Sequence, residues 1–359
     1  MEWVRLGKLV DIKTGKLNAN AAVPNGKYPF FTTAQEISYI DSYSYDDEVV
    51  LVAGNGDLNV KYYKGKFDAY QRTYILTKKE NAELNLKFLY FFMTDYVKIL
   101  RSQSIGGVIK YIKLENLTEA KIPLLSFVQQ TNIVDMLNKT EALIKNRKEQ
   151  IQAYDDLIES LFFEMFNHLE VKETSLKKHI KFSKNSVSDF SDYLDENYIG
   201  VENIEKETGR ILKVEKVSDS NIKSSKNYFT RDDVLYSRIR PNLNKVALPD
   251  FDGLVSSEVF VINCGSEINK FFLTYTLRSK KFVTYAMLNS SGANFPRVNK
   301  KIIEGYKIKV PPIELQNKFA EYVIKIEEEK KKLNSSLKEL EDLFDALMQD
   351  AFSGNLFKD

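Results

Sequence analysis

QTNIVDMLNKTEALIKNRKEQIQAYDDLIESLFFEMFN, residues 130–167, decides how this chain is organised, because a similar stretch returns 186 residues later. The second stretch is QNKFAEYVIKIEEEKKKLNSSLKELEDLFDALMQDAFS, residues 316–353, and the two align without a gap. Eight of the 38 aligned pairs are identical: Gln130/Gln316, Lys139/Lys325, Glu141/Glu327, Lys145/Lys331, Asp156/Asp342, Leu157/Leu343, Leu161/Leu347 and Phe166/Phe352. A repeat period this long indicates a whole duplicated domain with its helix, rather than a solenoid unit.

Both stretches place apolar residues at a seven-residue spacing, which is typical of helices that pack lengthwise. We call the positions at this spacing the seam, with ten positions in each stretch. Seventeen of the 20 seam positions are apolar, and the exceptions are Thr140, Arg147 and Lys330. We expect two helices, each about 60 Å long at 1.5 Å per residue, packed as an antiparallel coiled coil with internal pseudo-two-fold symmetry. The packing positions are predicted to be Ile133, Leu137, Ile144, Ile151, Ile158, Leu161, Phe319, Val323, Leu333, Leu337, Leu340, Phe344 and Leu347.

Signals for helix ends agree with these spans. Ser126 and Gln129 form a capping-box pattern, Pro312 stands where a first helical residue is expected, and Gly354 follows the second helix as a C-terminal cap. The predicted division has four parts: a first domain (1–125), a first spacer helix (126–170), a second domain (171–311) and a second spacer helix (312–359).

The segments before the helices are also related, but their middles differ in length. Residues 6–8 align with 176–178, residues 88–89 with 272–273, and Gly106 with Gly292, so the offset drifts from 170 to 186. Strand-like runs at 49–52, 74–76 and 259–262 alternate with Gly, Asn and Asp turns and short helical stretches. The sequence therefore predicts two mixed α/β (α+β) domains of one fold with different inserts.

Composition excludes several classes of protein. The chain has 359 residues, a single cysteine (Cys264) and two histidines, His168 and His179. Because these residues are so few, the composition predicts no disulfide framework, metal site or catalytic triad. We find no GxxxxGK[ST] loop, no signal peptide, and no apolar run of the roughly 20 residues that span a bilayer. We expect a cytoplasmic protein without cofactor, metal or catalytic activity of its own, and without a membrane partner.

Local charge is more informative than the net charge of +2. Two basic clusters suit contact with phosphates and base edges, although ordinary solvated surface is an alternative for each. The first cluster is Lys223, Lys226, Arg231, Arg238, Arg240 and Lys245, and the second is Arg297, Lys300, Lys301, Lys307 and Lys309.

The order domain, helix, domain, helix resembles the specificity subunit of Type I restriction-modification systems over nearly the whole chain. The segments that carry the resemblance are 28–33, Gly54-Asn55-Gly56, 65–73, 198–204, 233–247, Phe295-Pro296-Arg297-Val298, and the approaches from Ile122-Pro123 to Gln130 and from Val310-Pro311-Pro312 to Gln316. The first domain departs from the family pattern at Lys110-Tyr111, where the second domain has Pro296-Arg297.

The resemblance implies two target-recognition domains that each read half of a split site in double-stranded DNA. It also implies helices that set the spacing and dock two methyltransferase (modification) subunits, and through them restriction (translocase/nuclease) subunits. The residues predicted to contact DNA are Asn55, Arg72, Lys110, Tyr111, Arg238, Arg240, Asn242, Asn244, Lys245 and Arg297.

Some of these assignments have alternatives. We expect Arg238 and Arg240 to point the same way from a strand that runs into Pro241, but either could instead pair with Asp232 or Asp233. The side chains of Asn242 and Asn244 are expected to read adenine or to close the turn.

Other functions are also open. A stand-alone methyltransferase needs a methyl-donor loop and a catalytic tetrapeptide, and the sequence shows neither. A coiled-coil adaptor that binds only proteins, or a specificity subunit of a related restriction system outside Type I, remains an alternative.

Overall fold

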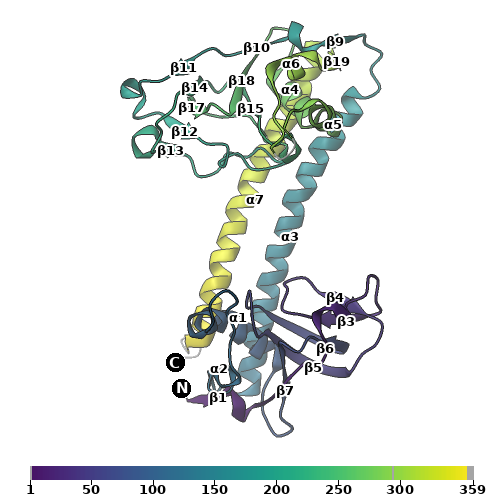
Figure 1. Cartoon of the computed structure of the whole chain (residues 1–359), viewed down its shortest axis with the longest axis vertical. Coiled ribbons are helices and arrows are strands. Elements are labelled where there is room, and N and C mark those ends of the chain that lie inside the picture. The colour runs from purple at the N-terminus through teal and green to yellow at the C-terminus, as the bar shows by residue number, and fades with distance from the viewer. Residues whose placement is uncertain (1, 293–294, 354–359) are drawn as a thin grey trace. The chain divides into compact units, whose positions relative to one another are not determined.

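The computed structural model describes residues 2–292 and 295–353. The chain forms two compact units, one made of Met1–Lys148 with Ser335–Asp359 (unit 1) and one of Glu149–Asn334 (unit 2). Two long helices, α3 (Phe127–Phe166) and α7 (Ile313–Ser353), each contribute to both units (Figure 1).

Unit 1 is built on a six-stranded sheet with the order β2-β7-β5-β6-β3-β4, in which only β3 and β6 pair in parallel. The central strand β5 carries the run 49–52, which is buried throughout, as a strand covered on both faces should be. Helix α1 packs on β5 and β6, and its buried side chains Phe88 and Phe92 have ring contacts with Phe352 of α7. The elements are β1 (Trp3–Arg5), β2 (Val10–Thr14), β3 (Tyr28–Phe31), β4 (Ser38–Ile40), β5 (Tyr45–Ala53), β6 (Val60–Ala69), β7 (Thr73–Lys78), α1 (Leu86–Gln103), α2 (Leu114–Thr118) and β8 (Lys121–Pro123).

Unit 2 has a four-stranded sheet, β10-β18-β15-β16, and a five-stranded sheet, β11-β14-β17-β12-β13. Helix α4 packs against β15 and β16. The elements are β9 (Glu173–Ser175), β10 (Ile180–Phe182), β11 (Ser186–Val187), β12 (Asn197–Ile199), β13 (Glu215–Lys216), β14 (Lys226–Phe229), β15 (Val234–Ser237), β16 (Val246–Ala247), β17 (Gly253–Ser256), β18 (Val259–Cys264), α4 (Lys270–Arg278), α5 (Lys280–Asn289), α6 (Lys300–Gly305) and β19 (Lys307–Lys309).

The predicted duplication is visible in the topology of the two units. Strands β1 and β8 pair in unit 1 as β9 and β19 do in unit 2, and each pair leads into a 3-10 turn at 6–8 or 176–178. The order β2-β7-β5 is repeated as β10-β18-β15. The remaining strands are arranged differently, because unit 1 extends this sheet with β6, β3 and β4, whereas unit 2 extends it only with β16 and builds a separate five-stranded sheet.

The two long helices begin with different local signals. The capping box at the start of α3 is confirmed: the Gln129 amide donates to Ser126 Oγ over 3.3 Å, and the Ser126 amide donates to Gln129 Oε1 over 3.0 Å. Helix α7 begins at Ile313, and the carbonyl of Pro312 accepts from the amides of the first turn. Gly354 lies outside the described residues.

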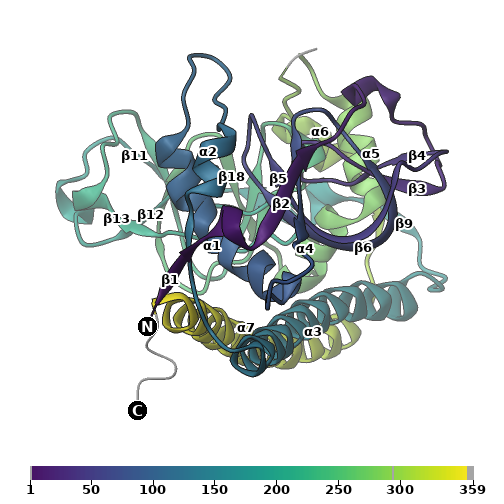
Figure 2. The same cartoon turned by 90° about the horizontal axis from the view of Figure 1, so that it is seen from below.

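Within each unit the two helices run antiparallel. In unit 1, Ile133 and Leu137 near the start of α3 share a core with Met348 and Phe352 near the end of α7. Unit 2 reverses this relation, because late residues of α3 such as Ile158 share a core with early residues of α7 such as Phe319. The helices lie side by side in two perpendicular views (Figures 1 and 2).

Burial along the seam is strongest where a domain core covers the helices. Ile133, Leu137, Ile158, Phe319 and Val323 are buried, whereas the other predicted packing positions are half-buried: Ile144, Ile151, Leu161, Leu333, Leu337, Leu340, Phe344 and Leu347. The seam residue Lys330 is also buried, because its ammonium forms ion pairs with Asp155 on α3 (2.5 Å) and Glu327 on α7 (2.8 Å).

Candidate nucleic-acid interface

In unit 2, three of the predicted arginines lie together where two loops meet. Beyond β15, the segment 238–240 lies against the segment 296–298: the Arg240 amide donates to the Pro296 carbonyl over 2.8 Å, and the Val298 amide donates to the Arg238 carbonyl over 2.8 Å. A bridge between Ile239 and Arg297 completes this two-loop frame. Residues almost 60 apart in the sequence thus place Arg238, Arg240 and Arg297 at one site.

The expectation that Arg238 and Arg240 point the same way from a strand is wrong. Strand β15 ends at Ser237, and Arg240 has a left-handed backbone (φ 49°, ψ 63°), so the strand alternation does not reach these residues. The guanidinium of Arg238 is half-buried and lies 5.4 Å from the ring centroid of Phe260. The guanidinium of Arg240 lies 4.9 Å from the ring centroid of Phe295.

Glu258 is the carboxylate within this cluster, and sequence reasoning missed it. Its Oε1 lies 3.3 Å from Arg297 Nη2, and its Oε2 lies 3.7 Å from Arg238 Nε. The expected alternative partners are engaged elsewhere: Asp232 pairs with Lys270, and Asp233 accepts from the amide of Thr230. Among the described residues Arg240 has no carboxylate partner, which leaves its charge available for an external group.

The remaining predicted contacts in unit 2 differ in orientation. Asn242 is exposed. The side-chain amide of Asn244 ties the turn to distant segments, because it donates to Glu207 Oε2 (3.1 Å) and to the Arg278 carbonyl (3.0 Å). Lys245 donates to the Val201 carbonyl over 2.8 Å, and burial lowers its pKa. Asn244 and Lys245 therefore stabilise the fold, and neither side chain is free to read a base in this conformation.

Several other residues of the basic clusters also serve the fold. Lys226 is buried, donates to the carbonyl and hydroxyl of Ser224, and has its pKa lowered by burial. Arg231 pairs with Asp252 at 3.3 Å, and Lys309 donates to the Leu169 carbonyl. The candidate site thus narrows to the arginines of the two-loop frame and their neighbours.

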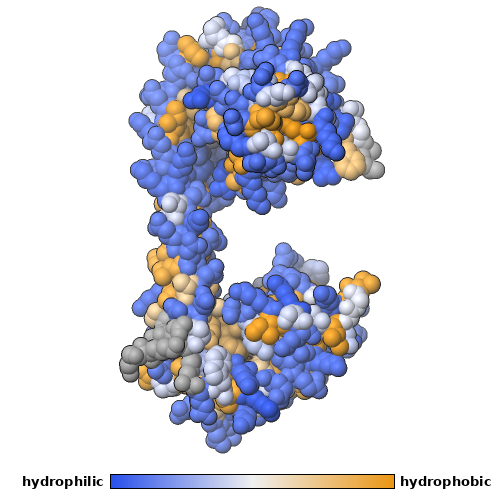
Figure 3. All heavy atoms as spheres, turned by 90° about the vertical axis from the view of Figure 1, so that its left-hand side faces the viewer, coloured by the Kyte–Doolittle hydropathy of each residue, from blue (hydrophilic) through white to orange (hydrophobic). Residues whose placement is uncertain are grey.

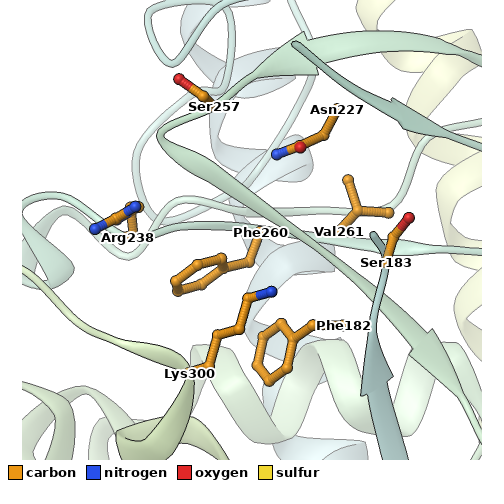
Figure 4. Close-up of a pocket in the computed structure, with 8 residues that line it drawn as sticks. All are labelled: Phe182, Ser183, Asn227, Arg238, Ser257, Phe260, Val261 and Lys300. Carbon is orange, nitrogen blue, oxygen red and sulfur yellow. The ribbon is translucent and has the colours of Figure 1, made fainter. Parts of the chain in front are cut away.

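A pocket of about 180 Å³ lies beside this frame (Figure 4). Lys300, which the sequence placed only in a basic cluster, lies with its ammonium 5.2 Å from the ring centroid of Phe182 and 5.9 Å from that of Phe260. Aromatic faces, fixed cations and small polar groups in one pocket suit contact with a nucleotide. The lining residues are Phe182, Ser183, Asn227, Arg238, Ser257, Phe260, Val261 and Lys300.

Unit 1 repeats the two-loop frame with different side chains. The Gly56 amide donates to the Lys110 carbonyl over 2.9 Å, and the Ile112 amide donates to the Gly54 carbonyl over 3.0 Å. Asn55 forms a bridge with Tyr111, as Ile239 does with Arg297. By this hydrogen-bond pattern Gly56 is equivalent to Arg240, and Tyr111 is equivalent to Arg297.

All four contacts predicted in the first domain are brought together by this frame. The Gly54 amide donates to the carbonyl of Arg72 over 2.8 Å, which places Arg72 beside Asn55. The side chains of Arg72, Lys110 and Tyr111 are exposed and that of Asn55 is half-buried. The departure from the family pattern at Lys110-Tyr111 is thus a change of side chains at an unchanged backbone position.

Neither unit presents a large apolar face in the view shown. Figure 3 shows a mostly hydrophilic surface with small separate apolar patches. The described residues include no group of three or more His, Cys, Asp and Glu side chains that could hold a metal ion. No helix among them is long and apolar enough to cross a membrane.

Comparisons with known proteins agree with this arrangement. Residues 1–153 and 163–342 match the family model of the Type I restriction modification DNA specificity domain. The chain is 28% identical to the Type I restriction enzyme EcoDI specificity subunit of Escherichia coli, over 99% of this chain and 89% of that protein. It is 24% identical to a putative type I specificity subunit of Mycoplasma pneumoniae, over 88% of this chain and 86% of that protein.

Solved structures show the same fold. The S subunit of a Type I restriction-modification system from M. genitalium has a TM-score of 0.65 at 18% identity, covering 98% of this chain and 96% of that one. A chain from a study of complex assembly and conformational transition of the type I R-M system has a TM-score of 0.56 at 14% identity, covering 99% and 98%. Because the family model matches both halves, this chain belongs to the family of DNA specificity subunits of Type I restriction-modification systems.

Proposed function

We propose that this chain is the DNA sequence-recognition subunit of a Type I restriction-modification complex and that it reads a bipartite site in double-stranded DNA. The observation that carries the proposal is the duplicated two-loop frame, which holds 54–56 against 110–112 in unit 1 and 238–240 against 296–298 in unit 2. The backbone frame is the same while the exposed side chains differ. Such a pair of sites suits two readers that dock alike and recognise different sequences.

The chemistry of the exposed groups supports DNA as the ligand. Arginine offers a planar fork that matches the O6 and N7 acceptors of guanine or a phosphate, and Arg240 and Arg297 are the exposed arginines of the second frame. In the first frame, Arg72 and Lys110 supply positive charge beside Asn55, whose amide suits adenine. We assign reading to residues 1–125 and 171–311, and spacing to residues 126–170 and 312–359.

The long helices offer equivalent positions for two modification subunits. Exposed apolar side chains occur on both helices at aligned positions, Met136 with Tyr322 and Leu157 with Leu343. An internally repeated docking surface suits two copies of one partner, in the same way that duplicated binding sites do in symmetric assemblies. Restriction subunits would then join through the modification subunits, and the proposal assigns no catalytic step to this chain.

A domain exchange tests the proposal. Residues 1–125 are replaced by the corresponding domain of a relative that has glutamine at the position of Gln130, because this side chain ties the domain to α3. The complex is expressed with its modification subunit, and the methylated sites are mapped. One half of the methylated motif should change while the other half stays the same, since each unit holds its own frame.

The reciprocal exchange of residues 171–311 should change only the other half. If either exchange alters both halves together, the two-reader model is wrong. If the wild-type complex methylates DNA without a sequence requirement, the chain is not a recognition subunit.

A further inference from the structure

A loop in unit 1 exposes apolar side chains beside the two-loop frame. Val108 is fully exposed (102%), Ile109 is 62% exposed, and Ile105 and Tyr111 are exposed to a smaller extent (43% and 41%). Single exposed apolar residues are ordinary on a protein surface, but four within a seven-residue loop are not. We define Val108 and Ile109 as the apolar tip. The frame is built from backbone hydrogen bonds, so it does not depend on these two side chains.

The loop is pinned in place at its base. Ile105 and Tyr111 exchange two backbone hydrogen bonds of 3.0 and 2.9 Å, and the Lys110 carbonyl accepts from the Gly56 amide. Gly106 has φ 116°, and a Cβ there would lie 2.5 Å from the Ile109 carbonyl oxygen, so the tight turn requires glycine. The tip is therefore carried on a defined turn joined directly to the reading segment.

Unit 2 offers an equivalent feature at the same place in its frame. Ser291 and Arg297 exchange the same pair of backbone hydrogen bonds, and Gly292 has φ 97°. Phe295, aligned with Ile109, is 61% exposed and lies under the guanidinium of Arg240. Both frames thus carry an exposed apolar side chain next to cationic groups.

We propose, resting on the proposed function, that the apolar tip acts as a wedge that enters between adjacent base pairs of the half-site read by unit 1. Apolar side chains at a groove partly unstack a base step and kink the duplex, which allows more protein surface to contact the DNA. Phe295 has the same task in unit 2. The wedge also contributes to specificity, because base steps differ in the free energy needed to unstack them.

Two observations favour DNA over a protein partner for the tip. Two aliphatic side chains on a narrow turn offer far less area than the roughly 800 Å² per partner of a stable protein interface. The neighbouring groups on the same frame are Arg72 and Lys110, for which the described residues supply no carboxylate partner, and this charge suits a phosphate backbone.

The test uses the full chain in complex with its modification subunit and a duplex that carries the mapped site. 2-Aminopurine replaces each adenine of the site in turn, except the adenines that are methylated. Its fluorescence rises when the base loses its stacking partner. We expect a several-fold rise at one position of the half-site read by unit 1 and loss of that rise in the double variant Val108→Ser/Ile109→Ser.

Affinity and salt dependence give a second readout. The double variant should bind the site at least about ten-fold more weakly, equivalent to about 1.4 kcal/mol. The slope of affinity against salt should be unchanged, because no phosphate contact is lost. The matched control Val23→Ser/Ile37→Ser removes one exposed valine and one exposed isoleucine elsewhere in unit 1 and should behave as wild type.

The remaining outcomes overturn the inference in distinguishable ways. If the wild type binds specifically without any fluorescence rise, the wedge proposal is wrong and the proposed function stands. The same conclusion follows if the rise survives in the double variant. Loss of assembly with the modification subunit in the absence of DNA would assign the tip to a protein contact. A wild-type complex that does not prefer its own site would overturn the proposed function together with the wedge.

Discussion

At the scale of single residues, Arg240, which we propose to contact DNA, has an unusual backbone conformation. Its φ of 49° lies in the left-handed region, which is uncommon for residues other than glycine and costs roughly 1 kcal/mol. The equivalent position in unit 1 is Gly56, with φ 71°. A strained arginine with an exposed side chain, at a position where glycine fits freely, supports the proposal that this side chain binds DNA.

Arg240→Gly separates reading from folding better than an alanine, because glycine accepts the same backbone without strain. Stability toward urea should stay the same or rise by up to about 1 kcal/mol. Binding to a duplex with the correct second half-site should weaken by about 1–3 kcal/mol if Arg240 reads a base edge. The measurement is the affinity for duplexes altered in one half at a time.

Asn244 supplies the matched control, because it has nearly the same backbone conformation (φ 50°) but a hydrogen-bonded side chain. Asn244→Gly should lower stability and leave the preference for the second half-site unchanged. An Arg240→Gly complex that weakens equally on all sequences would show a phosphate contact instead of base reading.

At the scale of elements, one buried glutamine joins each domain to the start of its long helix. Gln130 donates to the carbonyls of Glu83 and Leu125 and accepts from the amide of Asn85. Gln316 makes the same three bonds to Glu267, Pro311 and Asn269 in unit 2. The identity of these two residues in the aligned stretches thus has a structural reason.

Replacing either glutamine by alanine should loosen the joint between domain and helix. Each change leaves partly buried backbone groups without a partner, so the free energy of unfolding of that unit should fall by about 1–3 kcal/mol. Urea unfolding followed by circular dichroism, on Gln130→Ala and Gln316→Ala separately, measures the effect. The exposed Gln349→Ala on α7 is the control and should change stability little. Equal stability of all three variants would show that the glutamine bonds are replaceable.

At the scale of the whole molecule, the proposed task of the helices is to set the gap between two half-sites. Helices α3 and α7 each contribute residues to both units. A change in the length of these helices therefore changes the segments that connect the two units. The ion pair between the buried Lys330 on α7 and Asp155 on α3 also holds the two helices in one register in unit 2.

Inserting four residues into both helices, after Lys148 and after Asn334, adds about 6 Å while nearly keeping the helix face that points inward. At about 3.4 Å per base pair this is close to two base pairs. The methylated motif should keep both specific halves while its unspecified middle grows by one to two positions, as a methylation map would show. An active insertion complex with an unchanged middle would mean that the helices only dock partners.

The duplication, the presence of two long helices and the capping box were readable from the sequence, because helix periodicity and caps depend on neighbours within a few turns. The family resemblance was readable for the same reason, since its motifs are contiguous. The two-loop frame could not be predicted from the sequence, because it forms from backbone hydrogen bonds between segments such as 238–240 and 296–298 that are far apart in the chain.

Only the tertiary structure decided which polar residues face outward. Asn244 and Lys245 looked like contacts for DNA but bond inward, because residues distant in the sequence place Glu207, Arg278 and Val201 against them. Arg240 kept its predicted exposure for a reason the sequence does not contain, since its direction follows from a left-handed turn rather than from strand alternation. Local patterns determine elements, whereas the direction of a loop side chain depends on the distant backbone that its loop meets.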